Sequence, residues 1–363
     1  MSKVAVALSG GIDSAVVAAL LLEKGYEVIG ITGKMTCDKD AEIVVANAKK
    51  VADKLGIEHF TVDVTNKFNK HVIDYFKNSY KEGLTPNPCI ICNKEIKWGE
   101  LFDYAINTLN VDYIATGHYA KRVDVSEDYV EMHKSFDQNK DQTYFLSQVS
   151  QGQLQTCLFP LGDIDKTEVR RLAHELNLNI ADKQDSTGVC FIGERNFKEF
   201  LNNYLPSKPG DIVDIVTKEV VGHHDGVLYY TLGQRRGLGI GGLKGKTPIS
   251  WFVVSKDVYK NILYVAQGDE NEYLNSDRAI IRMVNWTYKE KPSGDLHVGC
   301  KFRYRQKDLG VTLRFIKDDE VELIFDEPYK AVTPGQAAVF YLDEVCLGGG
   351  IIDEVYYKGV RKN

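Results

Sequence analysis

Short apolar runs alternate with helix-like segments through the first third of the chain. The runs KVAVAL, YEVIGIT, HFTVDV and VDYIAT are strand-like, and the segments between them are rich in Ala, Leu and charged residues. We predict helices over residues 14–24, 41–55 and 94–109, with Gly25 and Gly56 ending the first two. Because strands that alternate with helices indicate βαβ units, we expect an α/β domain with a doubly wound parallel sheet.

The sequence pattern changes from alternating strands and helices to strands near the stretch LPSKPGDIVD, where Pro206, Pro209 and Gly210 break the helical pattern. Beyond it, short runs of alternating apolar and polar residues are separated by turns, as in sandwiches and barrels. A single β domain from residue 206 onward is the simpler interpretation. Because 363 residues exceed one ordinary core, we expect two or three domains. We predict three: the α/β domain at 1–205, a small β-rich central domain at 206–274 and a C-terminal β-barrel-like domain at 275–363.

The composition is that of a soluble protein with reduced cysteines. Hydrophobic residues make up 44% of the chain and charged residues 26%, which is typical of a soluble globular protein. A net charge of -6 argues against indiscriminate binding of polyanions, although not against a local basic patch. Seven cysteines, an odd number, indicate reduced thiols rather than a disulfide framework. No apolar run has the length of a membrane span and no signal peptide is recognisable, so we expect a cytoplasmic protein.

The stretch SGGIDS follows the first predicted strand and leads into the first predicted helix. Gly10 and Gly11 allow the backbone to approach an anion closely, and the helix N-terminus offers unpaired N–H groups. Asp13 either suits a phosphate that carries magnesium or caps the helix. The chain lacks G-x-x-x-x-G-K-[ST] and therefore has no Walker A loop. An ordinary capped turn is the alternative interpretation.

A second informative stretch is TPNPCIICNKEIKW, which contains a C-x-x-C pair. If Asn93 caps the helix that follows, Cys92 lies near a helix N-terminus. There the helix dipole, Lys94 and Lys97 would lower the pKa of its thiol. The pair alone is compatible with a redox couple, half of a metal site or buried packing.

The remaining cysteines are isolated. Cys190 lies between Gly188 and Gly193, so we expect it on a bend. Isolated cysteines are mostly small buried hydrophobes, and we interpret four in this way: Cys37, Cys157, Cys300 and Cys346. Near the C-terminus, the stretch KFRYRQK would place Lys301, Arg303 and Arg305 on one strand face, where they could contact phosphates.

The motif S-G-G-x-D-S after the first strand resembles the PP-loop of the ATP pyrophosphatases. Further blocks, in the same order, resemble the tRNA-specific 2-thiouridylase family from the first strand to near the C-terminus: ALSGGIDSAV, TPNPCIICNKEIKW, ATGHYA, KDQTYFLSQV, LGDIDKTEVR, DSTGVCFIGERNFKEFL, TLGQRRGLGIGG, RYRQ and TPGQAAVFYLDEVCLGGGII.

The resemblance implies replacement of the C2 oxygen of wobble uridine 34 by sulfur, in tRNAs for Lys, Glu and Gln. It implies that ATP, with Mg²⁺, adenylates this oxygen, so that AMP becomes the leaving group and pyrophosphate is released. The target base must leave its stack, at a cost of roughly a few kcal/mol. Two rival functions remain. One is another PP-loop synthetase, such as an argininosuccinate or GMP synthetase type, and the other is an RNA-binding protein with a relic nucleotide site.

The resemblance also implies roles for individual residues. The nucleotide site comprises Ala7, Leu8, Ser9, Gly10, Gly11, Ile12, Asp13, Ser14, Met35 and Gly117. The catalytic residues are Asp13, Cys92 as nucleophile and Cys190 as persulfide carrier. The target base contacts Asn87, Pro88 and Cys89. Further tRNA contacts are His118, Lys140, Asp141, Gln142, Arg303, Tyr304 and Gln336.

Two sulfur-transfer schemes compete for the same cysteines. In the first, a sulfur carrier or cysteine desulfurase delivers a persulfide to Cys190, and Cys92 assists release through a disulfide. In the second, Cys89, Cys92 and Cys190 hold three irons of a 4Fe–4S cluster whose fourth iron binds exogenous sulfide. Cys89 is needed only by the second scheme.

Overall fold

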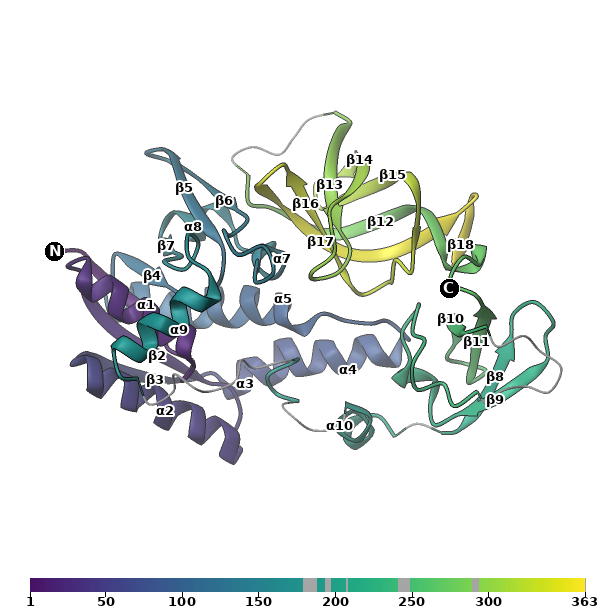
Figure 1. The fold of residues 1–363 in the computed structure, drawn as a ribbon, viewed down its shortest axis with the longest axis horizontal. Coiled ribbons are helices and arrows are strands. Elements are labelled where there is room, and N and C mark those ends of the chain that lie inside the picture. Colours follow the sequence, from purple (N-terminus) through teal and green to yellow (C-terminus); the bar gives the residue numbers. More distant parts are fainter. Residues whose placement is uncertain (179–187, 193–196, 207, 241–248, 289–293, 363) are drawn as a thin grey trace.

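The computed structural model describes residues 1–178, 188–192, 197–206, 208–240, 249–288 and 294–362. An N-terminal α/β part, a small central sheet and a C-terminal barrel follow one another along the chain (Figure 1). This architecture confirms the predicted fold class. None of the described helices combines the length and the apolar character needed to cross a membrane.

The first sheet is parallel throughout, as predicted. Its order is β3 (Glu58–Asp63), β2 (Glu27–Lys34), β1 (Lys3–Ala7), β4 (Tyr113–Ala115) and β7 (Cys157–Leu158). The central strand β1 pairs with β2 and with β4. The carboxyl ends of β1, β2 and β4 therefore meet at one edge, which is where ligands bind in such sheets.

Helices cover both faces of this sheet. Val4 and Val6 of β1 pack on one side, against α1 (Ile12–Glu23), α2 (Lys39–Leu55) and α9 (Lys166–Glu175). Ala5 packs on the other side, since successive strand residues point to opposite faces. The elements of that second layer include α3 (Thr65–Phe68), η1 (Asn69–Ile73), α5 (Pro88–Cys92), η2 (Asn93–Leu101) and α6 (Phe102–Asn107).

Local capping signals predict two helix ends correctly. Gly56 ends α2 in the left-handed conformation, with φ 68°. Asp165 begins α9, where its carboxylate accepts a hydrogen bond of 2.8 Å from the N–H of Glu168.

The helix predicted at 94–109 begins earlier than expected. It starts at Pro88 and continues through the π-helical segment η2 into α6. Proline suits the first helical position because its φ is already helical and it has no N–H to leave unpaired. Asn93 therefore lies inside the helix rather than capping it, and its side-chain amide donates to the carbonyl of Phe145 at 2.8 Å.

The central sheet has the order β10 (Trp251–Asp257), β11 (Ile262–Gln267), β8 (Gly210–Asp214) and β9 (Val220–His224). Its core includes Phe76 and Tyr80 of α4 (Asp74–Lys81) and Phe200 of α10 (Phe197–Tyr204). The catalytic and central parts thus share one hydrophobic core.

The C-terminal sheet closes on itself. Its order is β12 (Asn275–Trp286), β15 (Glu320–Lys330), β14 (Leu309–Lys317), β13 (Leu296–Lys301), β16 (Ala337–Leu342) and β17 (Val345–Tyr357). A further pairing of β12 with β17 completes the barrel. The hairpin of β5 (Lys121–Ser126) and β6 (Tyr129–His133) belongs to the N-terminal part but joins β17 through His133 and Val345. The remaining short elements are α7 (Thr143–Leu146), α8 (Gln151–Gln155), η3 (Val227–Tyr229), η4 (Glu272–Leu274) and β18 (Val360–Lys362).

Candidate active site

The loop between β1 and α1 is held in place by its own serines. The Ser14 hydroxyl accepts a hydrogen bond of 3.1 Å from the N–H of Ser9 and donates one of 3.2 Å to the carbonyl of Gly11. Gly11 occupies the position before the helix, without any side-chain cap. The first N–H groups of α1 therefore remain available to an anion.

Two glycines allow this loop to lie very close to neighbouring backbone segments. Gly10 has φ 67°, and a Cβ there would lie 2.9 Å from the carbonyl oxygen of Val44. A Cβ on Gly117, which follows β4, would lie 2.9 Å from the backbone nitrogen of Ser14. Any side chain at either position would disturb the loop, so both predicted nucleotide-site glycines are sterically required.

Asp13 is in the first turn of α1 and does not cap the helix. Its Oδ1 accepts a hydrogen bond of 3.1 Å from the hydroxyl of Tyr119 and forms an ion pair of 2.6 Å with Nζ of Lys166. The Lys166 side chain is 11% exposed and that of Asp13 is 34% exposed. The carboxylate therefore lies in a partly covered position beside the phosphate loop, with a cation next to it.

Lys166 and Tyr119 were not predicted as site residues. Both lie within blocks that resemble the family, LGDIDKTEVR and ATGHYA. The capping signal at Asp165 was the available clue, because it places Lys166 at the first position of α9. The contact of α9 with α1 is a tertiary contact that no local pattern reveals.

The cysteine cluster comprises Cys89, Cys92 and Cys190. The first two lie one turn apart on α5, so they share one side of that helix. Cys190 lies in the described turn 188–192, whereas Gly193 lies outside the described residues. Phe191 anchors this turn by ring contacts with Phe68 and Phe76. Phe191 packs in the same hydrophobic cluster as Cys92, and Cys190 raises the pKa of both Cys89 and Cys92, so the three predicted thiols lie near one another.

Burial raises the pKa of these thiols, contrary to the prediction for Cys92. Desolvation is the largest cause in all three, raising the pKa of Cys89 to about 11 and that of Cys92 to about 12. Lys97 lowers the pKa of each thiol but does not outweigh desolvation. Cys190 is exposed to solvent on one side, and the protein around it still raises its pKa. The helix N-terminus expected at Cys92 is absent because the helix begins at Pro88.

Three of the four cysteines interpreted as packing residues are buried: Cys157, Cys300 and Cys346. Cys37 is exposed, so the interpretation was wrong for this residue. It lies beyond the end of β2, in a segment that leaves the sheet, where no core surrounds it. Met35 lies in the same segment and packs partly against the core of the second layer.

These environments predict an order of thiol reactivity. Only a thiolate reacts with iodoacetamide, so we expect Cys37 to be labelled first at pH 7.5 and Cys92 to be almost inert. Labelling of Cys92 should rise roughly tenfold for each pH unit between 8 and 10, since its raised pKa keeps the thiol protonated there. Peptide mass spectrometry at timed intervals measures both rates, with urea-unfolded protein as control. Equal rates for Cys37 and Cys92 in the native protein would contradict the burial described here.

The predicted base-contacting segment is attached to the barrel. The N–H of Thr85 donates to the carbonyl of Pro334 at 3.0 Å, and the Gln336 side chain donates to the carbonyl of Thr85 at 2.8 Å. Asn87 hydrogen-bonds to Tyr144, which lies beneath the segment. Gln336 therefore positions the segment that contains Asn87, Pro88 and Cys89.

His118 lies between Thr116 and Lys97. Its Nδ1 is 2.9 Å from the Thr116 hydroxyl, and its Nε2 is 3.4 Å from Nζ of Lys97. Desolvation and Lys97 hold the pKa of His118 well below its usual value, so the ring is neutral. Of these two partners, Lys97 belongs to the helix that continues from Cys92, and Thr116 follows the end of β4.

Of the segment Lys140–Gln142, only Lys140 and Gln142 are partly exposed. Asp141 is buried and accepts hydrogen bonds from Thr143 and Ser135. Gln142 uses its side-chain oxygen to accept from the N–H of Tyr119. The Asp141 carboxylate organises the interior of this segment and is not available to a tRNA, which corrects the prediction for its side chain.

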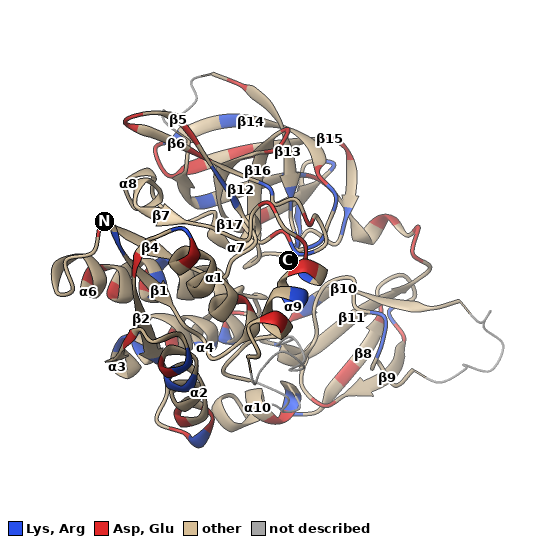
Figure 2. Cartoon of the chain, turned by 60° about the vertical axis from the view of Figure 1, so that its left-hand side comes forward, with Lys and Arg blue, Asp and Glu red and all other residues tan. Residues whose placement is uncertain are grey.

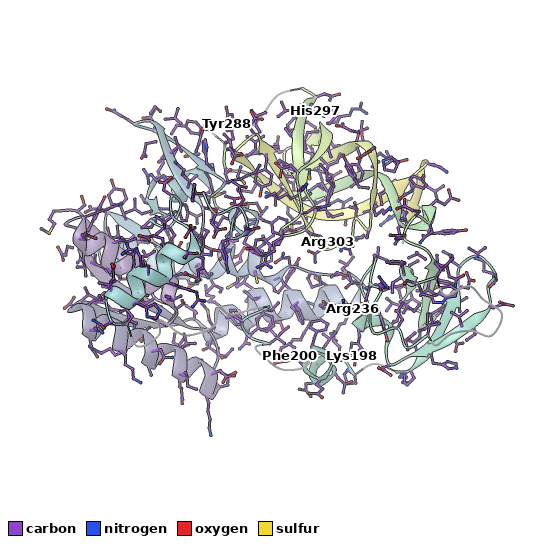
Figure 3. The ribbon with its side chains drawn as sticks, viewed as in Figure 1. Lys198, Phe200, Arg236, Tyr288, His297 and Arg303 are labelled. Atoms are coloured by element: carbon purple, nitrogen blue, oxygen red, sulfur yellow. The ribbon has the colours of Figure 1, made fainter. Side chains whose placement is uncertain are left out.

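The predicted basic strand face at residues 301–305 is not formed. Strand β13 ends at Lys301, which is buried and pairs with Asp141 at 3.4 Å. Arg305 has φ 66°, so the chain turns there and the strand alternation is lost. Arg303 reaches across to the central part, where its Nη2 donates to the carbonyl of Leu232 at 3.0 Å (Figure 3).

Tyr304 packs against Phe145 with ring centroids 4.5 Å apart. Arg303, Tyr304 and Arg305 line a cavity of about 270 Å³ together with Phe302, Gln306, Lys330 and Ala331. Elsewhere Lys and Arg are interspersed with Asp and Glu over all parts of the chain (Figure 2). The predicted contacts Arg303 and Tyr304 therefore line the same pocket as a second arginine, Arg305.

The cluster scheme requires three thiolates, each bound to a different iron of one 4Fe–4S cluster. Three cysteines are chemically suitable ligands for iron. In the part of the chain that the structure describes, however, no three His, Cys, Asp or Glu side chains are grouped so that they could hold a metal ion. A site for a single ion differs from one for a cluster, which would be held by Cys89, Cys92 and Cys190, and no step below passes through a cluster.

Three family models match successive parts of the chain. One described as the tRNA methyl transferase HUP domain matches residues 2–194. One described as the tRNA methyl transferase PRC-barrel domain matches residues 198–267, and one described as the Aminomethyltransferase beta-barrel domain matches residues 276–352.

The chain is similar over nearly its whole length to two curated bacterial proteins. It is 50% identical to the tRNA-specific 2-thiouridylase MnmA 2 of Geobacillus kaustophilus and 49% identical to the tRNA-specific 2-thiouridylase MnmA of Geobacillus thermodenitrificans. Both matches cover 99% of this chain and 97% of the relative. A solved structure, the U34-tRNA thiolase NcsA of Methanococcus maripaludis with its 4Fe–4S cluster, is 21% identical with a TM-score of 0.35, over 56% of this chain and 63% of that one.

Proposed function

The chain belongs to the tRNA-specific 2-thiouridylase family, and we propose that its phosphate loop and its cysteine cluster carry out the two successive steps of 2-thiouridine synthesis in tRNA. The observation that carries this proposal is the presence of both parts in one α/β domain. The glycine loop lies at the end of β1, and two of the thiols, Cys89 and Cys92, lie on a helix that covers the same sheet. A PP-loop synthetase that makes amide bonds would need the first part alone.

In the first step, ATP binds with its phosphates at the N-terminus of α1. The backbone N–H groups of the loop neutralise the phosphate charge, and Gly10 and Gly117 allow the close approach. A Mg²⁺ ion fits the exposed side of the Asp13 carboxylate, because Mg²⁺ is commonly held by one carboxylate and substrate phosphates. When bound, it would reduce the negative charge on the phosphates. The C2 oxygen of the wobble uridine then attacks the α-phosphorus, and pyrophosphate leaves.

The target uridine has to leave the anticodon loop to reach this site. Asn87, Pro88 and Cys89 would contact the extruded base, and the barrel holds that segment through Gln336. Arg303 and Tyr304 would contact the tRNA farther out, mainly through phosphates and shape.

In the second step, a persulfide on Cys190 supplies sulfur. Its terminal sulfur attacks C2, and AMP leaves with the former C2 oxygen. Cys92 loses its proton to water and attacks the sulfur of Cys190, forming a Cys92–Cys190 disulfide. The transferred sulfur keeps its bonding electrons and remains on C2 as the 2-thio group. A sulfur carrier or cysteine desulfurase reloads Cys190 after a thiol reductant has opened the disulfide.

A thiolation assay with unmodified tRNA-Glu transcript tests the function. The wild-type protein is incubated with ATP, Mg²⁺ and either sulfide or a persulfide donor under anaerobic conditions, and the tRNA is run in a mercury-containing gel. We expect a retarded band that requires ATP, with iron-free protein fully active on the persulfide donor. ATP turnover without a retarded band from either sulfur source would refute the proposed function, and activity that requires bound iron would refute the persulfide route.

A further inference from the structure

The helix that carries Cys89 and Cys92 changes its winding immediately after the second thiol. Residues Asn93–Leu101 form the π-helical segment η2. In a π-helix the hydrogen bonds join residues five apart, whereas an α-helix joins residues four apart. Lys97, five residues beyond Cys92, is thereby turned toward the side of the helix that carries Cys92. Such segments occur frequently at functional sites.

The Lys97 ammonium has a specific hydrogen-bond partner. Its Nζ lies 3.4 Å from Nε2 of His118. An ammonium group can only donate, so Nε2 must accept and the single proton of the neutral ring must be on Nδ1. That N–H then donates to the Thr116 hydroxyl at 2.9 Å. The ring also packs on Trp98, with ring centroids 5.3 Å apart. His118 is thus held in one tautomer that directs an acceptor at Lys97.

The Lys97 charge acts on the whole cysteine cluster. It lowers the pKa of Cys89, Cys92 and Cys190, opposing the desolvation that raises all three. The transfer chemistry proposed above requires anionic sulfur twice, at the terminal persulfide sulfur and at Cys92. A desolvated pocket disfavours both anions unless a positive charge lies nearby.

We propose that Lys97 provides the fixed positive charge that stabilises anionic sulfur during sulfur transfer, and that His118 is the positioning residue that holds it there. This inference rests on the proposed function of the cysteine cluster. It gives His118 a role within the protein, distinct from the tRNA contact that the family resemblance implies. Because Lys97 acts on the thiols, its effect should fall on sulfur transfer and not on adenylation.

Single-turnover experiments on the full-length protein separate these two steps. Lys97→Met should slow formation of thiolated tRNA by about 100- to 1000-fold, as expected for loss of one preorganised electrostatic group. The burst of pyrophosphate, one per bound tRNA, should keep its wild-type rate. Lys97→Arg should restore most of the transfer rate. His118→Leu should slow the same step, whereas His118→Gln, which keeps an acceptor near the position of Nε2, should retain it.

Lys67→Met is the matched control. Lys67 pairs with Glu100 of the same π-helical segment at 2.7 Å, and both side chains are largely solvent-accessible. Its loss removes an equal charge without approaching the thiols, so the transfer rate should stay within about twofold of wild type. Wild-type transfer by Lys97→Met, or equal slowing of pyrophosphate release and transfer, would overturn the role of Lys97. A wild-type protein that does not thiolate tRNA would instead refute the proposed function itself.

Discussion

We expect Cys190→Ala and Cys92→Ala each to lower 2-thiouridine formation by about 1000-fold or more, while the pyrophosphate burst with tRNA and ATP persists. Each thiol performs a separate bond exchange, so neither can replace the other. Residues that act as one unit are strongly non-additive, and the double variant should be no slower than either single one. Mercury-gel quantification of thiolated tRNA, together with pyrophosphate release from the same reaction, measures both quantities.

Two further cysteine variants serve as comparisons. Cys37 is exposed and lies away from the cluster, so Cys37→Ala should have wild-type activity. Cys89→Ala separates the sulfur schemes, because a cluster needs this ligand and a persulfide relay does not. Substantial thiolation by Cys92→Ala would contradict the disulfide step, and loss of activity in Cys89→Ala together with loss of iron would favour the cluster.

Lys166→Met should have the opposite pattern, with loss of the pyrophosphate burst itself. Lys166 is the cation beside Asp13 and the phosphate loop, at 2.6 Å from the carboxylate. Without it, Asp13 loses its ion-pair partner, and one positive group near the phosphates is lost. We expect adenylation to fall by about 100- to 1000-fold, as for loss of one preorganised donor. Lys166→Arg should recover part of this rate.

Arg171→Met on the same helix is the matched control for Lys166. Arg171 is half-exposed and pairs with Glu168 and Glu175 on the outer side of α9. Exposed pairs of this kind contribute roughly 0–1 kcal/mol, so this variant should adenylate tRNA normally. A wild-type pyrophosphate burst from Lys166→Met would mean that the ion pair with Asp13 only stabilises the fold.

The candidate site can be located in the sequence where its signals are short-range. The SGGIDS loop and the C-x-x-C pair are short motifs with fixed spacing, and Cys190 lies in a block that resembles the family. The structure brings the three thiols together. The start of the cysteine-bearing helix was missed because Pro88 is equally compatible with an extended segment and with the first turn of a helix. The direction of the pKa of Cys92 was also wrongly predicted, because desolvation by burial raises it and no local pattern shows that burial.

The amino-acid sequence by itself determined the α/β alternation, the β-rich second half, the helix ends at Gly56 and Asp165 and the glycine loop. Each of these depends on neighbouring residues only. The tertiary structure alone decided that Lys166 meets Asp13 across 153 positions and that Lys301 is buried with Asp141. It also decided that desolvation outweighs Lys97 at the thiols. The physical reason is that burial and charge pairing depend on what packs around a group, and those neighbours come from distant parts of the chain.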